Sequence, residues 1–238
     1  MSNLKLGGVD ARVVGNLDDG GLVVVLLHGF GAPGTDLVPL GEFIECPPST
    51  CFVFPEAPLT PPMLMGGRAW WMLDIQELEE AMASGKPRDR SGSVPEGSEE
   101  PRKLMTAFLA ELIEEHGVEP KRIVLGGFSQ GSMVATDVLL RSDWEFAGLI
   151  IWSGTLLAKN EWVPLMAKRK GLRVVQSHGE ADPLLPYELA EKLRDHLREG
   201  GLMVDWVNFA GGHEIPPQVL DHTSALLAKL SSELKRSG

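Results

Sequence analysis

Cysteine, positive charge and long apolar runs are all scarce in this sequence. Its 238 residues include two cysteines, Cys46 and Cys51, which are close enough along the chain to pair. In a cytosolic protein such cysteines are expected to stay reduced and structural. Only 22 Lys and Arg face 33 Asp and Glu, which gives a net charge of −11. A surface of that sign repels nucleic-acid phosphates and anionic lipid, which argues against either as the main partner.

No segment predicts a membrane span. The longest apolar run near the start, Leu22–Leu27, falls far short of the roughly 20 residues that a helix needs to cross a bilayer. The first residues lack the apolar core of a secretion signal, so we expect a cytoplasmic protein. No Cys/His cluster has the spacing of a metal site, and we expect no cofactor. The sequence leaves the oligomeric state open, with a homodimer among the options.

Short apolar runs alternate with amphipathic ones along the chain. Continuously apolar runs are typical of strands covered on both faces, and they lie at Leu22–Leu27, Cys51–Phe54, Arg122–Leu125, Gly148–Trp152, Arg173–Ser177 and Met203–Phe209. Leu4–Leu6 and Ala11–Val14 could add an antiparallel hairpin at one edge. Apolar residues at helical spacing predict helices over Leu104–Ile113, Ser132–Leu140, Leu189–Leu197 and Gln218–Leu234.

This alternation predicts an α/β fold, with a mostly parallel central sheet and helices on both faces, over a single domain spanning residues 1–238. Residues 84–101 are rich in Gly, Pro, Ser and charge, so we expect a surface loop there. Only 20 residues separate the predicted strands Gly148–Trp152 and Arg173–Ser177. That interval cannot hold a large cap, so any site above the sheet should be open.

The strongest motif is Gly127-Phe128-Ser129-Gln130-Gly131, a G-x-S-x-G sequence between a predicted strand and a predicted helix. Glycines are needed there because the chain turns so sharply that flanking side chains would collide. The turn exposes the serine hydroxyl above the strand ends and points the following N–H groups at the same place. The motif therefore predicts Ser129 as a nucleophile.

A serine hydroxyl needs an imidazole to take its proton and an acid to orient that imidazole. His213 lies in a glycine-rich loop after the last predicted strand, where the base of such a site belongs, whereas His196 and His222 fall within predicted helices. Asp182 follows the preceding strand and is the favoured acid, with Glu180 as its competitor. His178 is expected to bond nearby backbone, and Asp205 is a poor candidate because it lies inside a strand.

Two further segments follow strands at the same end of the predicted sheet. His28-Gly29-Phe30-Gly31 follows Leu22–Leu27 and can supply one oxyanion donor, while the amide of Gln130 supplies the other. We expect His28 to be structural because His213 fills the role of base. An unusual group of Met, Leu and Trp side chains then predicts an acyl-binding wall, although ordinary loop packing is the alternative: Met63, Leu64, Met65, Trp70 and Trp71.

Together these segments resemble the phospholipase/carboxylesterase family, which includes the acyl-protein thioesterases. The segments that resemble family motifs are His28–Gly31, Phe54–Pro58 with Trp70, Gly126–Gly131, His178–Asp182 with Pro186, and Gly212–Ile215. The resemblance implies an α/β-hydrolase fold without a large cap domain. It also implies Ser129, Asp182 and His213 as the triad and the amides of Phe30 and Gln130 as oxyanion donors. The step from Trp70 to Asp74 is longer than usual in the family, which leaves the register of the substrate loop open.

The predicted activity is that of a serine carboxylesterase that hydrolyses carboxylic esters through a Ser-His-Asp triad and an acyl-enzyme. Its expected partner is a small-molecule ester or thioester. Two alternatives remain: a lysophospholipase or acyl-protein thioesterase, and a non-catalytic ligand-binding relative that keeps the fold.

Overall fold

A computed structural model describes residues 1–74, 89 and 91–237, and its central feature is one eight-stranded sheet. The strand order is β1-β2-β4-β3-β5-β6-β7-β8. β1 pairs antiparallel with β2, β2 pairs antiparallel with β4, and all other neighbours are parallel. The strands are β1 (Ser2–Leu6), β2 (Val9–Val14), β3 (Val23–Leu27), β4 (Cys51–Pro55), β5 (Ile123–Phe128), β6 (Gly148–Trp152), β7 (Arg173–Gly179) and β8 (Met203–Phe209).

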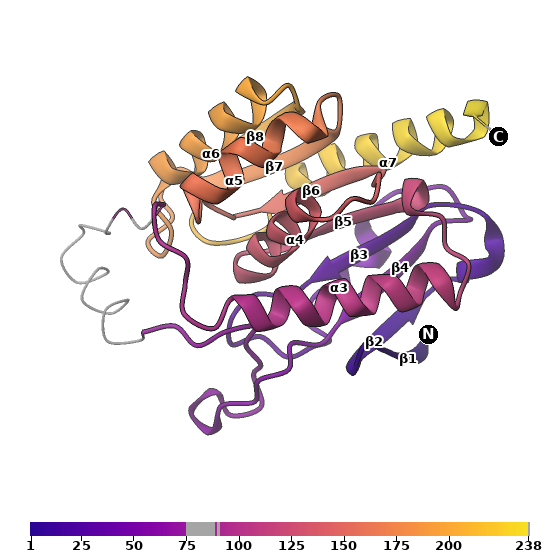
Figure 1. Ribbon diagram of the computed structural model, residues 1–238, viewed down its shortest axis with the longest axis horizontal. Helices are drawn as coiled ribbons and strands as arrows, with labels where there is room; N and C mark the ends of the chain where they lie inside the picture. Colours follow the sequence, from indigo (N-terminus) through magenta and orange to yellow (C-terminus); the bar gives the residue numbers. More distant parts are fainter. Residues whose placement is uncertain (75–88, 90, 238) are drawn as a thin grey trace.

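Helices cover both faces of this sheet. They are α1 (Leu40–Phe43), α3 (Glu99–Glu114), α4 (Gln130–Arg141), α5 (Lys159–Met166), α6 (Tyr187–Glu199) and α7 (Pro217–Ser237). One apolar core joins the sheet to α3, α4, α5 and α6, and a second core joins the other face to α7. Figure 1 shows α3 and α4 lying across the front of the sheet. The fold predicted from the sequence, α/β with helices on both faces, is confirmed.

The predicted strands are confirmed to within three residues at each end, the largest difference being at the end of β5, and the helices are longer than predicted. α3 begins at Glu99, so the predicted surface loop ends before Pro101 and not at it. The first turn suits a helix start for two reasons. Glu99 and Glu100 complement the positive end of the helix dipole, and Pro101 lacks an N–H group at a position where that group would have no helical partner. Residues 84–88 and 90 of the predicted loop lie outside the described residues.

The interval between β6 and β7 holds a short helix that the sequence pattern did not predict. Pro164 lies inside α5, and because proline is unusual within a helix the sequence pattern indicated a loop. Trp162 and Met166 of α5 are buried in the core. Because α5 packs down onto the core, it forms no cap over the sheet, as expected. The carboxyl ends of β3, β5, β7 and β8 therefore meet at an edge without a large covering domain.

Two other expectations concern the chain as a whole. Cys46 and Cys51 are both free thiols, and burial raises the pKa of Cys51 to about 11. Among the helices of the described part of the chain, none is both long and apolar enough to cross a bilayer.

Candidate active site

Ser129 stands between β5 and α4, at the sharp turn that its flanking glycines allow. Its backbone is in a strained conformation, with φ 52° and ψ −122°. A Cβ atom on either Gly127 or Gly131 would collide with the carbonyl oxygen of Leu27 at the end of β3. The Ser129 amide is held by the Trp152 carbonyl at 2.8 Å. Strain of this kind persists only where the surroundings enforce it, and it presents the half-buried Ser129 at the start of α4.

His213 lies in the loop after β8, and its imidazole is bonded to Asp182. His213 Nδ1 is 2.6 Å from Asp182 Oδ2, so Nδ1 carries the proton and Nε2 is left to accept one. The opposite side of the ring packs against Phe128, with ring centroids 4.7 Å apart. Ser153, after β6, donates its hydroxyl hydrogen to the Glu214 carbonyl at 3.4 Å and so holds the next residue of the loop.

Asp182 is fixed by its own turn. Its side chain is fully buried, and Oδ1 accepts hydrogen bonds from the amides of Leu184 at 2.8 Å and Leu185 at 3.0 Å. Burial alone would raise the pKa of Asp182, but the hydrogen bond from His213 and the two amides outweigh it and lower the pKa. Asp182 is therefore an anion whose Oδ2 faces the His213 imidazole and also lies 3.3 Å from His178 Nε2.

The competing acids and bases do not contact His213 in the way Asp182 does. Glu180 is exposed and accepts a hydrogen bond from Asn208 Nδ2 at 2.5 Å, so Asp182 and not Glu180 reaches His213. His178 is confirmed as a residue that bonds nearby backbone, with Nε2 at 3.0 Å from the Leu185 carbonyl. The remaining pairs are surface ones: His196 with Glu199 at 2.9 Å and His222 with Asp205 at 2.7 Å.

His213 lies close to Ser129 in the structure, because the His213 ring packs against the ring of Phe128, the residue before Ser129. A direct hydrogen bond from the Ser129 hydroxyl to the imidazole is not made between these two described residues. Such bonds are often long without substrate and tighten only in the reacting complex.

The loop after β3 lies against the elbow. A Cβ on Gly29 would meet the Phe128 ring at 3.2 Å and Ser129 Cβ at 3.5 Å, so only glycine leaves room for this approach. Neither the Phe30 amide nor the Gln130 amide donates a hydrogen bond within the described part of the chain. Gln130 is the first residue of α4, where N–H groups lack helical partners.

Side chains around these two segments form hydrogen bonds that the sequence pattern did not predict. Gln130 accepts the Trp70 amide at 2.9 Å and donates to the Trp71 carbonyl at 2.9 Å. The Trp70 indole in turn donates to the His28 carbonyl at 2.8 Å. His28 is confirmed as a buried structural histidine, because its Nε2 accepts the Ala57 amide at 3.0 Å. Gln130 and Trp70 thus join the turn at Ser129 to the loop that follows β3.

The predicted acyl-binding wall divides into two environments. Trp70 and Trp71 are 1% and 4% exposed and belong to the core, where Trp70 makes the bonds just described. Met63 and Met65 are 66% and 95% exposed, on the purple loop that projects from the lower left of Figure 1. Leu64 lies between them and approaches Gly31 of the oxyanion loop, within 3.8 Å of a Cβ built there.

Comparison with known proteins identifies the chain. The profile of the family described as Phospholipase/Carboxylesterase matches residues 10–231. The chain belongs to this family. An acyl-protein thioesterase 1 from Gibberella zeae is 29% identical over 217 residues, covering 87% of this chain and 89% of that protein. One from Mycosarcoma maydis is 30% identical over 189 residues, covering 72% and 73%.

Solved structures agree with the family. Esterase PE8 superposes with a TM-score of 0.77 at 30% identity, covering 95% of this chain and all of its own. A Bacillus cereus carboxylesterase has a TM-score of 0.72 at 19% identity, over 93% and 94% of the two chains, and supports the fold alone. The chain is therefore a hydrolase of the phospholipase/carboxylesterase family with the α/β-hydrolase fold.

In this phospholipase/carboxylesterase family member, a buried ion pair supports the loop after β3. Glu56, after β4, is bonded to Arg68 at 2.8 Å and to Arg12 at 3.2 Å, with 9% of its side chain exposed. The backbone of Arg68 bonds Gly31 and Ala32, at 2.8 and 2.9 Å. Sequence analysis noted the segment around Glu56 but not this ion pair, because the partners are remote in sequence.

Glu56→Gln should therefore destabilise the fold. We expect the free energy of unfolding in urea to fall by about 2–3 kcal/mol, less than the full cost of breaking a buried pair because both arginines are partly exposed. Glu119→Gln is the matched control, since Glu119 pairs with Lys121 on the surface, where both side chains are 58% exposed. A control loss as large as that of Glu56→Gln would contradict the argument.

Two buried histidines predict that stability falls in mild acid. Burial lowers the pKa of His28 and of His178 below the ordinary 6.5. Below pH 6.5 the unfolded chain therefore binds protons on these residues that the folded chain does not yet bind, so folding loses free energy as pH falls. At pH 7.5 and above this loss is absent.

Urea denaturation at pH 7.5 and 5.5 measures the effect. We expect the free energy of unfolding to fall by at most about 1.4 kcal/mol per pH unit for each histidine. His28→Gln should flatten this pH dependence, whereas His196→Gln, a change in a surface pair, should not. An unchanged slope in His28→Gln would contradict the assignment.

Proposed function

We propose that this enzyme hydrolyses carboxylic esters and thioesters, with Ser129, His213 and Asp182 as its triad. The observation that carries the proposal is the 2.6 Å bond from His213 Nδ1 to Asp182 Oδ2. It leaves Nε2 as the only nitrogen free to accept a proton, on a ring that packs against the neighbour of Ser129. An imidazole oriented in this way by a buried carboxylate is the general base that a serine nucleophile requires.

The reaction takes two steps. In the first, His213 Nε2 accepts the proton of Ser129 as Oγ attacks the carbonyl carbon, and the resulting imidazolium then gives that proton to the leaving oxygen or sulfur. The product is an acyl ester on Ser129. In the second step water loses a proton to His213 and attacks this ester, and Ser129 regains its hydrogen as the carboxylic acid leaves. Asp182 stays ionised throughout and stabilises the imidazolium.

The amides of Phe30 and Gln130 stabilise the negative oxygen of each tetrahedral intermediate. Donors fixed before the reaction cost no reorganisation when the charge develops. The hydrogen bonds of Trp70, His28 and the Gln130 side chain support this role, because they join the loop after β3 to the first residue of α4.

A fluorophosphonate probe tests the proposal directly. The probe should label the native protein on one residue, Ser129, identified by peptide mass spectrometry, because only an activated serine attacks phosphorus at a useful rate. Heat-denatured protein and the His213→Ala variant are the controls and should not be labelled. Failure to label the native protein, or labelling of another serine, would contradict the proposal and favour a non-catalytic ligand-binding relative.

A second candidate is favoured by the relatives. Proteins named acyl-protein thioesterase 1 match up to 87% of this chain, and the matched proteins are covered to a similar extent. The absence of a large domain between β6 and β7 also leaves room for a substrate whose bulk stays outside. We therefore propose thioesters of long acyl chains, or lysophospholipids, as the alternative natural substrates.

Matched O-acyl and S-acyl peptides of increasing chain length separate the readings. A carboxylesterase should show its highest kcat/KM on short O-acyl substrates, and a thioesterase on long S-acyl ones. The cytoplasmic location stays a prediction from the sequence, and the oligomeric state stays open, with a homodimer among the options.

A further inference from the structure

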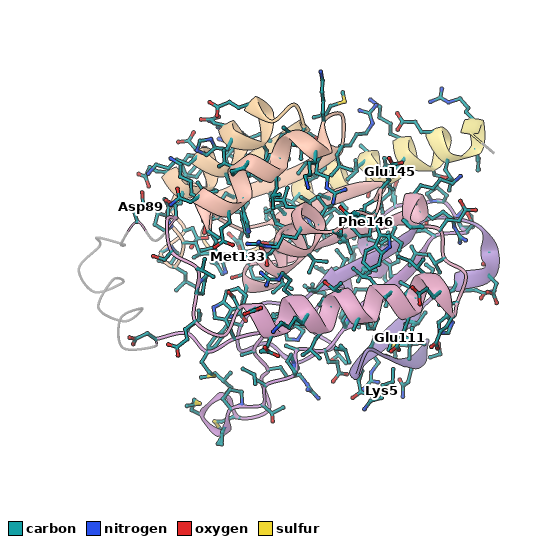
Figure 2. All side chains as sticks on the ribbon, in the orientation of Figure 1. Lys5, Asp89, Glu111, Met133, Glu145 and Phe146 are labelled. Atoms are coloured by element: carbon teal, nitrogen blue, oxygen red, sulfur yellow. The ribbon has the colours of Figure 1, made fainter. Side chains whose placement is uncertain are left out.

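A cavity lies at the edge of the sheet opposite Ser129. It has a volume of about 330 Å³ and opens where β6 and β7 begin, between the end of α4 and the second half of α7. Figure 2 labels Glu145 and Phe146 of its wall at one end of α4, and Met133, one turn after Ser129, at the other. The strands between them span roughly 15–20 Å, so this cavity is separate from the candidate active site.

The wall of this cavity is positive, although the protein carries a net charge of −11. Its charged side chains are Lys168, Arg169, Lys170, Arg173, Glu145 and Glu233. Arg173 and Glu233 neutralise each other at 2.7 Å. Lys168 and Lys170 are exposed and make no ion pair with any described residue. Two exposed ammonium groups thus remain at the mouth of the cavity without an ion-pair partner among the described residues, and Glu145 is the unpaired carboxylate on the same wall.

Arg169 adds a cation that is partly withdrawn from water. Its guanidinium donates to the Trp144 carbonyl at 2.7 Å and to Ser142, and no described carboxylate lies within ion-pair distance. Burial lowers the pKa of Arg169, which Asp143 and Glu145 offset only in part. A cation in this position costs free energy that a bound anion would recover.

Apolar side chains also line this cavity, although most of its exposed surface is polar. They are Leu139, Phe146, Leu172 and Leu230, and three of them are buried. The cavity therefore combines convergent charges with a smaller apolar patch, which is enough for a short apolar group beside an anion. Glu145 would repel a doubly charged anion more strongly than a singly charged one, so a singly charged anion fits better than phosphate.

We propose that this cavity binds a small organic carboxylate with a short apolar tail. The carboxylate is bound by Lys168 and Lys170, and the tail packs against Phe146 and Leu230. The acid released by the proposed reaction belongs to this class, so the site can bind the product of the enzyme; that link rests on the proposed function, but the binding itself does not.

Heteronuclear NMR of the full-length protein, titrated with octanoate, tests the proposal. Saturable shifts are expected at the amides of residues 145–147 and 168–173. Lys168→Ala/Lys170→Ala should weaken binding by about tenfold or more, because hydrogen bonds to charged groups contribute that much. Lys5→Ala/Lys103→Ala is the matched control: it removes the same charge from exposed sites on β1 and α3 and should leave binding unchanged.

Two further probes define the ligand class. Octylammonium, with the same tail and the opposite charge, and inorganic phosphate, without a tail, should both bind more weakly than octanoate. The proposal is overturned by shifts absent from 168–173, by equal weakening in the control variant, or by equal binding of either probe. Because the readout uses no turnover, an inactive enzyme would count against the proposed function and leave this test intact.

Discussion

Replacing Ser129 by alanine is expected to lower kcat for p-nitrophenyl esters by about 10⁶-fold, the loss seen when a triad that acts as a unit is disabled. The cause is the removal of the attacking oxygen, since nothing else at the turn between β5 and α4 can form the acyl ester. Alanine is only one atom smaller than serine, so the fold should survive, with circular dichroism and urea denaturation as the check.

Ser232→Ala is the control for this experiment. Ser232 is exposed on α7, and within the described residues its hydroxyl bonds only the Ala228 carbonyl of its own helix, at 2.9 Å. It should keep full activity. Ser129→Ala protein that retains more than a small fraction of wild-type kcat would show that another group performs the attack.

Asp182→Asn should lower kcat by about 10⁴-fold, the known cost of holding the imidazole in the wrong tautomer. Asparagine can still accept the amides of Leu184 and Leu185, so the turn is preserved. Its NH₂ group, however, faces His213 Nδ1 as a donor, so the ring must move its proton to Nε2 and can no longer accept one from Ser129.

Glu180→Gln is the matched comparison, two residues away in the same loop. Its carboxylate bonds Asn208 at the surface, so kcat should change by less than about twofold, as is usual for surface substitutions. A larger loss in Glu180→Gln than in Asp182→Asn would reverse the assignment of the acid. Steady-state kinetics at pH 8 measures both variants. At this pH the loss of stability expected in mild acid is absent.

The sheet was predictable because each parallel strand is covered on both faces. Such strands need apolar residues at every position, and Val23–Leu27 and Gly148–Trp152 are buried throughout. α5 was not predictable in this way, because Pro164 interrupts its pattern and only two of its residues are buried. The starts of helices were placed late because their first turns are polar, as at Glu99 in α3.

The candidate site was predictable as far as local chemistry reaches. The elbow and the His213 loop are each specified by residues adjacent in sequence, and the strand ends bring them together. The supporting contacts were not, because they join remote segments through side-chain geometry. Gln130 was expected to contribute its amide alone, yet its side chain also fixes Trp70 and Trp71. Trp70, expected in a substrate wall, lies in the core instead.

The most direct test of the account is a crystal structure of the protein after reaction with a short alkyl phosphonate. We predict phosphorus bonded to Ser129 Oγ, one phosphonyl oxygen within hydrogen-bond distance of the Phe30 and Gln130 amides, and His213 Nε2 facing Ser129 Oγ. An adduct on another residue, or an imidazole turned away from Ser129 with the adduct in place, would contradict it.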